Sequence, residues 1–154
     1  MISIVRTDFE NQDFIGLVRF LDAYLAEKDG DQHSFYDQFN KIDKIKYVVM
    51  AYENEKPLGC GAIKPYGPTA MEVKRMYVSP ESRKNGLATR ILAELEHWAT
   101  DLGYNQCVLE TGKGQAEAIE LYKRNGYEQI PNYAPYTSIE NSLCFAKKLT
   151  NTRK

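Results

Sequence analysis

The sequence predicts an α/β (α+β) fold with a mixed, mostly antiparallel central sheet of about seven strands, flanked by about four helices. Three observations support this prediction. β-Rich runs recur with short turns between them in the first half of the chain, and two helices with apolar stripes separate the strands of the second half. The length of 154 residues suits one domain spanning residues 1–154.

The N-terminal part of the chain predicts a short strand followed by a helix. Ile2–Arg6 alternates apolar and polar residues, as a half-buried strand does. Apolar residues then recur at three- and four-residue spacing, and Asn11 or Asp13 is available to cap the predicted helix. This stripe consists of Phe14, Leu17, Val18, Leu21, Tyr24 and Leu25. A second short helix would present Phe35 and Phe39 on one face.

The middle of the chain predicts three consecutive strands. Tyr47–Tyr52 and Leu58–Lys64 are β-rich runs whose short separation fits a hairpin. A turn at Gly67-Pro68 leads to Met71–Val78, which ends at Ser79-Pro80 because proline lacks the amide that a central strand needs. This spacing predicts an antiparallel meander.

The second half of the chain alternates helices and strands. The apolar stripe of Leu87–Leu102 predicts the longest helix, and Gly103 stands where a left-handed cap would end it. A strand is expected at Gln106–Glu110 and a short helix at Ala116–Arg124. Two further strands, Tyr127–Ile130 and Ser142–Lys148, are expected to complete the sheet.

Composition argues against several classes of protein. The net charge of -1 shows no basic excess typical of nucleic-acid binding. The longest uninterrupted apolar run, Tyr47–Tyr52, is far shorter than the roughly 20 residues of a membrane span. The N-terminus has no apolar segment typical of a secretory signal, so we expect a cytoplasmic protein. The spacing of three cysteines and two histidines predicts buried free thiols and no metal.

Positive charge is concentrated in one segment of the chain. Residues 72–90 carry five cations and two anions, a local charge of +3 that leaves -4 on the rest, which favours a small anionic ligand. Within this segment the turn Arg83–Ala88 precedes the longest predicted helix. Gly86 permits close backbone approach, and the first-turn amides lack intrahelical acceptors, so the turn can hold a pyrophosphate. The alternative is an ordinary helix N-terminus with solvated cations.

Several linked motifs favour the pyrophosphate interpretation. Arg83, Gly86 and Ala88 fit the pattern of Arg or Gln, two residues, Gly, one residue, then Gly or Ala, and they follow a strand that ends in Met76–Pro80. Downstream the chain has Leu109–Gly112, then Ala118-Ile119, Leu121-Tyr122 and Gly126-Tyr127. In these features the sequence resembles the GNAT superfamily of acyl-CoA N-acyltransferases, most strongly over residues 45–130.

The resemblance implies acetyl-CoA as the acyl donor, and it assigns residues to the cofactor. Backbone groups around Met76, Tyr77 and Val78 would pair with the pantetheine arm, which a bulge within Met71–Val78 would admit into the sheet. The pyrophosphate would lie against Arg83, Lys84, Asn85, Gly86, Leu87, Ala88 and Thr89. Lys84 and Gln115 depart from the family pattern, which often has Gly and Asn there; Gln115 preserves the amide donor.

Catalytic roles follow from the same resemblance. Glu72 lies eleven residues before Arg83, as a catalytic glutamate does in some members, and would act as general base directly or through water. Alternatively, Glu72 is a charged residue at the exposed start of a strand. Glu110 is the second candidate, with a structural ion pair to Lys74 or Arg75 as its alternative. Tyr122 matches a tyrosine beside the cofactor sulfur and would protonate the leaving thiolate, unless it only closes its helix against the core.

The acceptor is the least determined part of the prediction. It should lie against the first two helices and the C-terminal hairpin, where Asp29, Asp31 and Asp37 are acidic. An aromatic slot could form from Tyr127, Tyr133 and Tyr136. These features suggest a small cationic or amino-acid-like amine as partner. The rivals are a protein lysine or N-terminus as acceptor, and a CoA-binding sensor without turnover; a homodimer is common among relatives.

Overall fold

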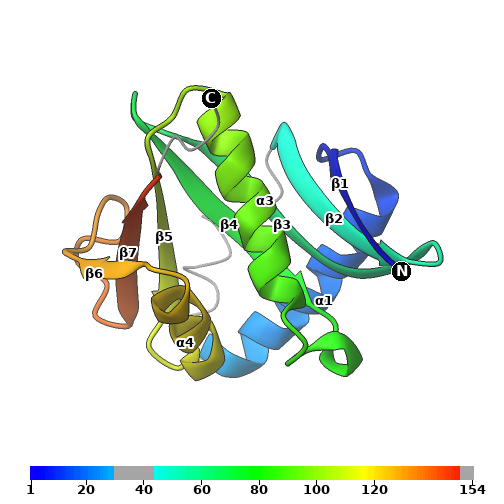
Figure 1. Ribbon diagram of the computed structural model, residues 1–154. Coiled ribbons are helices and arrows are strands. Elements are labelled where there is room, and N and C mark those ends of the chain that lie inside the picture. The colour runs from blue at the N-terminus through cyan, green and yellow to red at the C-terminus, as the bar shows by residue number, and fades with distance from the viewer. Residues whose placement is uncertain (30–43, 150–154) are drawn as a thin grey trace.

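The computed structural model describes residues 1–29 and 44–149, in which seven strands form one sheet of order β1-β2-β3-β4-β5-β7-β6 (Figure 1). β4 and β5 are parallel, and every other neighbouring pair is antiparallel. The predicted mixed, mostly antiparallel sheet is thereby confirmed. The strands are β1 (Ile2–Thr7), β2 (Tyr47–Glu53), β3 (Lys56–Tyr66), β4 (Ala70–Val78), β5 (Gln106–Gly112), β6 (Glu128–Ile130) and β7 (Ser142–Lys148).

The described residues contain three α-helices, which cover both faces of the sheet (Figure 1). These are α1 (Gln12–Asp29), α3 (Leu87–Asp101) and α4 (Ala116–Arg124), with a short 3-10 helix, η2 (Pro80–Ser82), after β4. α3 and α4 lie on one face and α1 on the other. The predicted helix with Phe35 and Phe39 lies outside the described residues.

Each face of the sheet has its own apolar core. Beneath α3, the buried Leu95 packs in one cluster with Met71 and Phe145. Beneath α1, Phe14 and Val18 pack with strand residues that include Met50. Successive side chains of each strand point to opposite faces of the sheet, so the strands pack against helices on both faces. The apolar stripes of α1 and α3 predict this arrangement.

The N-terminus of α1 distinguishes the two candidate cap residues. The Asn11 side-chain oxygen accepts a hydrogen bond from the amide of Phe14 at 2.9 Å, so Asn11 is the cap. Asp13 instead accepts a hydrogen bond from the Tyr52 hydroxyl at 2.8 Å. Asp13 thereby ties α1 to β2.

The first hairpin is tighter than the sequence predicts. Glu53 pairs with Lys56, so the turn is Asn54-Glu55, whose φ angles of 51° and 68° are typical of a type I′ turn. β3 consequently begins at Lys56 rather than at Leu58. Pro57 is tolerated within the strand because the register of β2 and β3 shifts beside it, and prolines occur at such irregularities.

The sheet splits between its two central strands. β4 and β5 pair only from Ala70 to Glu72 on β4, after which the two strands diverge. On the other side of β4, Cys60 faces Tyr77 and Ala62 faces Lys74, so two β4 residues oppose one residue of β3. This is the bulge expected within Met71–Val78, and it includes Arg75, whose φ is 60°. The split and the bulge position the site described next.

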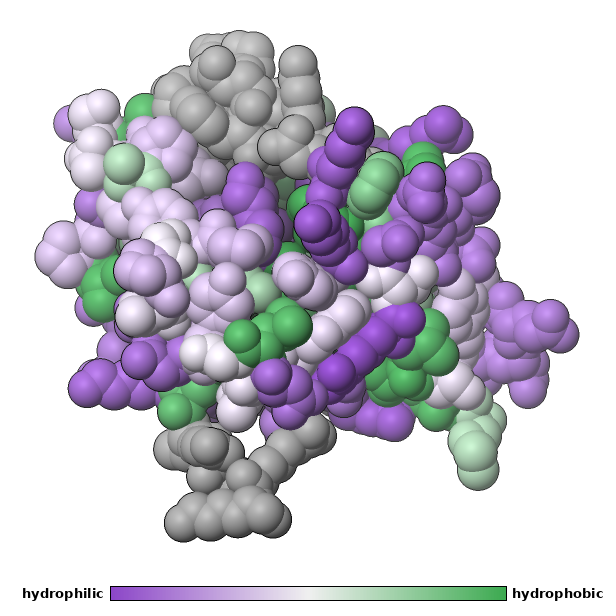
Figure 2. Space-filling view, turned by 90° about the horizontal axis from the view of Figure 1, so that it is seen from above, coloured by the Kyte–Doolittle hydropathy of each residue, from purple (hydrophilic) through white to green (hydrophobic). Residues whose placement is uncertain are grey.

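One end of the molecule has a surface of mixed character. Figure 2 shows the end of the molecule that lies at the top of Figure 1, where hydrophobic patches are separated by hydrophilic side chains. Within residues 1–29 and 44–149 the exposed large hydrophobic side chains are Met1, Val5, Phe20 and Leu102. In the same part of the chain, no helix is both long and apolar enough to span a bilayer.

Candidate active site

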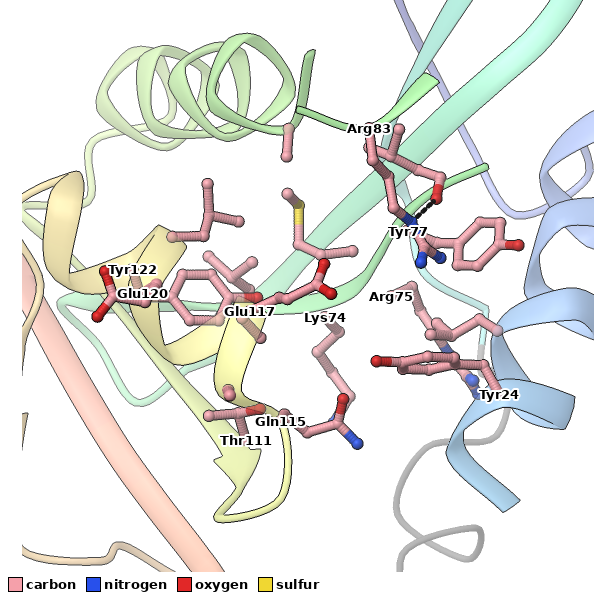
Figure 3. Close-up of a pocket in the computed structure, with 18 of the residues that line it drawn as sticks. Tyr24, Lys74, Arg75, Tyr77, Arg83, Thr111, Gln115, Glu117, Glu120 and Tyr122 are labelled. Carbon is pink, nitrogen blue, oxygen red and sulfur yellow. Dashed lines mark hydrogen bonds between the residues drawn. The ribbon is translucent and has the colours of Figure 1, made fainter. Parts of the chain in front are cut away.

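A cavity of about 540 Å³ occupies the split between β4 and β5 (Figure 3). Its walls come from α1, β4 from Glu72 onward, the N-terminal turn of α3, the end of β5 and α4. Because β4 and β5 no longer bond to each other here, backbone groups of both strands face the cavity. The cavity therefore offers main-chain partners and side chains together.

The structure brings nearly all of the predicted site residues to this cavity. Asn85 is the exception, because its side chain is exposed and the residue does not line the cavity. The predicted residues that line it are Glu72, Met76, Tyr77, Val78, Arg83, Lys84, Gly86, Leu87, Ala88, Thr89, Gln115 and Tyr122.

The turn before α3 has the backbone geometry of an anion cradle. Gly86 is the N-cap of α3 with φ 83°, and Lys84 also has a positive φ of 67°. A Cβ at position 86 would meet nothing within 4 Å, so the conformation, and not crowding within the chain, favours glycine. The first turn of α3 has no acidic side chain. Its backbone amides and the positive end of the helix dipole both face the cavity.

The Arg83 side chain stabilises this turn through contacts within the protein. Its Nε donates a hydrogen bond to the Val78 carbonyl at 2.7 Å, which Figure 3 marks. The guanidinium also lies 5.5 Å from the ring centres of both Tyr24 and Tyr77. The sequence does not predict this role of Arg83, because Tyr24 belongs to α1 and no local pattern links it to Arg83.

Gln115 presents a buried donor with no partner in the part of the chain that the structure describes. The residue is the N-cap of α4 and is only 7% exposed, and its Nε2 makes no hydrogen bond there. Leaving such a group unsatisfied costs about 1–3 kcal/mol. A ligand with an acceptor atom in this cavity would remove that cost, so Gln115 fits a bound cofactor.

Glu72 is not at an exposed strand start. It is 5% exposed, and its Oε2 accepts a hydrogen bond from the Tyr133 hydroxyl at 2.7 Å. Its Oε1 lies 3.7 Å from the Nζ of Lys74. Burial lowers the pKa of Lys74, and the Glu72 carboxylate opposes this effect. The solvated-residue alternative for Glu72 is therefore wrong.

Glu110 faces the same cavity from β5. Its Oε2 accepts a hydrogen bond from the Ser142 hydroxyl at 2.7 Å. Of the two cations that could pair with Glu110, Lys74 forms an ion pair with Glu72, and Arg75 forms one with Asp22 at 3.0 Å. The Glu110 carboxylate also acts on Lys74 and raises its pKa. Two carboxylates thus line one cavity, each oriented by a hydroxyl donor.

Tyr122 extends its ring from α4 into the cavity (Figure 3). The residue is 7% exposed, and its ring contacts Tyr127 with a centroid distance of 5.8 Å. Burial raises the pKa of Tyr122 well above its usual range, and Glu110 adds to this effect. Tyr122 is therefore a protonated hydroxyl donor at neutral pH.

The predicted aromatic slot is only partly correct. Tyr133 and Tyr136 lie together with ring centroids 5.8 Å apart, and Tyr136 lines the cavity. Tyr127 instead belongs to the core under α3, where its hydroxyl donates to Glu96 at 2.9 Å. The acidic residues Asp31 and Asp37 lie outside the described residues.

The cysteines are buried free thiols, as the sequence predicts. Burial raises the pKa of Cys60 to about 12 and that of Cys107 to about 12, so neither is a thiolate at neutral pH. This protonation does not favour a covalent acyl-enzyme. Among residues 1–29 and 44–149, no group of three His, Cys, Asp or Glu residues could hold a metal ion.

Solved structures share this arrangement of the sheet. A protein from Klebsiella pneumoniae assigned as an acyl-CoA N-acyltransferase matches with a TM-score of 0.82 and 28% identity, covering 97% of this chain and 99% of that one. The PaiA N-acetyltransferase of Thermoplasma acidophilum, solved with coenzyme A, matches in fold with a TM-score of 0.70 and 17% identity, covering 96% and 99%. The fold is that of the acyl-CoA N-acyltransferases.

The sequence comparisons narrow this class to a family. The IAA acetyltransferase of Azospirillum brasilense is 30% identical over 155 residues, covering 96% of this chain and 98% of its own. The model of the acetyltransferase (GNAT) family matches residues 8–127. The chain belongs to that family, and the resemblance found in its motifs is confirmed.

Proposed function

We propose that this protein transfers an acetyl group from acetyl-CoA to the primary amine of a small molecule, by direct attack within a ternary complex. The observation that carries the proposal is one continuous cavity with an anion cradle at one end and a buried carboxylate, Glu72, at the other. Family membership supports the acetyl transfer. The Azospirillum relative is named an IAA acetyltransferase, which also supports acetyl transfer.

The donor side of the cavity, Met76–Thr89, would bind acetyl-CoA. The α3 amides and the cations around them would hold the pyrophosphate, where charge-assisted contacts contribute about 1.5–3 kcal/mol each when partly desolvated. Backbone groups of β4 beyond the split would bond to the pantetheine arm, as an added strand does. The Gln115 Nε2, which has no hydrogen-bond partner among the described residues, would donate a hydrogen bond to the same acetyl-CoA.

Glu72 would supply the base. An amine with a pKa of about 10.4 is less than roughly one part in 10³ neutral at pH 7, a cost of about 4–5 kcal/mol. In the proposed reaction the Glu72 carboxylate takes one proton from the ammonium, and the neutral nitrogen attacks the thioester carbonyl carbon. A main-chain amide near Met76 would donate to the resulting oxyanion.

Tyr122 would complete the proton balance. As the intermediate collapses, the C–S bond breaks and the nitrogen carries one surplus proton. Because the hydroxyl of Tyr122 is buried and protonated, it would donate to the leaving sulfur and relay that proton from nitrogen to sulfur. The products are the amide and the free thiol, and Glu72 returns its proton to solvent.

Thiol release from acetyl-CoA tests this proposal, with polyamines, amino acids, aminoglycosides and lysine peptides as acceptors. We expect turnover with at least one small amine, and acetyl-CoA binding by calorimetry without any acceptor. Acetylation of peptides alone would replace the small-molecule assignment with a protein acceptor. Binding of CoA without turnover of any acceptor would overturn the enzymatic proposal and favour a sensor.

A further inference from the structure

Two opposite charges lie next to each other on the wall of the cavity. Glu72 and Lys74 are two residues apart on β4, so both side chains leave the same face of the strand. Their side chains are 6% and 7% exposed, and the Lys74 Nζ lies 3.7 Å from the Glu72 Oε1. Both residues line the cavity, and Figure 3 shows Lys74 extending into it.

Charges of both signs act on Lys74, and the largest of these effects comes from Glu72. After burial, the effects on the pKa of Lys74 are the Glu72 carboxylate, which raises it, Lys64 and Arg75, which lower it, and Glu110, which raises it least. The charge of Arg75 is matched by Asp22 of α1 at 3.0 Å. Glu72 is the ion-pair partner of Lys74 among the described residues. A further cation brought to this wall would meet repulsion from Lys74.

The base reaction changes this balance. When Glu72 takes a proton from the acceptor, its carboxylate charge is lost, and the buried Lys74 ammonium loses the charge of its ion-pair partner. Burial penalises an ammonium that has lost its ion-pair partner. A carboxylate carried by the acceptor itself would take the place of Glu72 beside Lys74, so proton transfer would leave no uncompensated charge.

We propose that the acceptor is an amine that also carries a carboxylate, of the α-amino-acid class, with Lys74 binding the carboxylate while the amine faces Glu72. The inference rests on the proposed acetyl transfer and adds the substrate class to it. An amine and a carboxylate separated by one carbon complement a carboxylate and an ammonium whose charged atoms lie 3.7 Å apart. Polyamines complement only half of this pair.

Matched acceptors test the assignment: each standard amino acid against the amine left when its carboxylate is removed. We expect kcat/KM to favour the preferred amino acid over its decarboxylated amine by roughly tenfold to a hundredfold, the range of a charge-assisted hydrogen bond. Lys74→Met should remove most of this preference by raising KM for the amino acid, and Lys74→Arg should retain part of it.

Lys64→Met is the control. Lys64 also lies near the pair, opposite Glu72 on β3, but it does not line the cavity, so the preference should survive this substitution. An equal loss of activity toward both members of each acceptor pair in Lys74→Met would overturn the assignment, as would a wild-type preference for polyamines or decarboxylated amines.

Calorimetry of amino acids against the CoA-loaded protein separates this inference from the proposed function. Binding that Lys74→Met weakens, without turnover of any acceptor, would support the carboxylate subsite and overturn the acetyl transfer. Turnover of simple amines without binding of any amino acid would overturn the subsite alone. Absence of both would overturn both.

Discussion

The two ends of the cavity are built in different ways. The donor side, Met76–Thr89, comes from one stretch of chain and presents mainly backbone groups, positioned by a strand end, a turn and a helix N-terminus. The acceptor side presents side chains from separate elements, with Glu72 on β4, Glu110 on β5 and Tyr136 between β6 and β7. The donor side is therefore sensitive to backbone conformation, whereas the acceptor side depends on individual side chains.

The largest expected effect is at the acceptor side. Glu72→Gln keeps the shape of the side chain but removes the base, so kcat/KM should fall by roughly 10²–10³-fold, within the range of general base catalysis. Acetyl-CoA affinity, measured by calorimetry, should stay unchanged because Glu72 lies at the other end of the cavity. Glu110→Gln is the matched control, and a larger loss in that variant would transfer the base role to β5.

Tyr122→Phe should have the next largest effect. The substitution removes the hydroxyl that donates to sulfur while the buried ring remains, so kcat should fall by roughly tenfold to a hundredfold. The control is Tyr127→Phe, which loses the hydrogen bond to Glu96 in the core under α3. Tyr127→Phe should lower the melting temperature but not kcat. If the two variants lose kcat equally, Tyr122 has only a packing role.

The same comparison explains what the sequence could predict. The fold can be predicted from local patterns. The turn residues, the apolar stripe of α3 and Gly103 each determine the conformation of residues close to them in the sequence. The α3 turn is equally local, so Arg83, Gly86 and Ala88 identify it. The burial of Glu72 and its contact with Tyr133 depend on elements far apart in the chain, and no local pattern carries that information. The sequence wrongly predicts Tyr127 in the aromatic slot for the same reason, since its partner Glu96 lies on α3, far from it in the chain.

Gly86→Ala tests whether the donor side depends on backbone conformation. At φ 83° an alanine is strained, so the unfolding free energy should fall by about 1 kcal/mol and KM for acetyl-CoA should rise several-fold. Gly67→Ala is the control, because Gly67 has φ 72°, equally open surroundings and no place in the cavity lining. It should lose similar stability without a change in KM. A rise in KM for both variants would show only general destabilisation.

The smallest expected effect separates charge from conformation at Lys84. Lys84→Ala and Lys84→Gly both remove an exposed charge, so each should raise KM for acetyl-CoA by no more than about fivefold, as for a solvent-screened contact. They differ in the backbone, because glycine adopts φ 67° without strain and alanine does not. Lys84→Gly should therefore be the more stable of the two by about 1 kcal/mol in chemical denaturation. A hundredfold rise in KM for both variants would mean that a side-chain charge dominates binding at this turn. The donor side would then depend on a side chain, as the acceptor side does, and the two ends of the cavity would not differ in this respect.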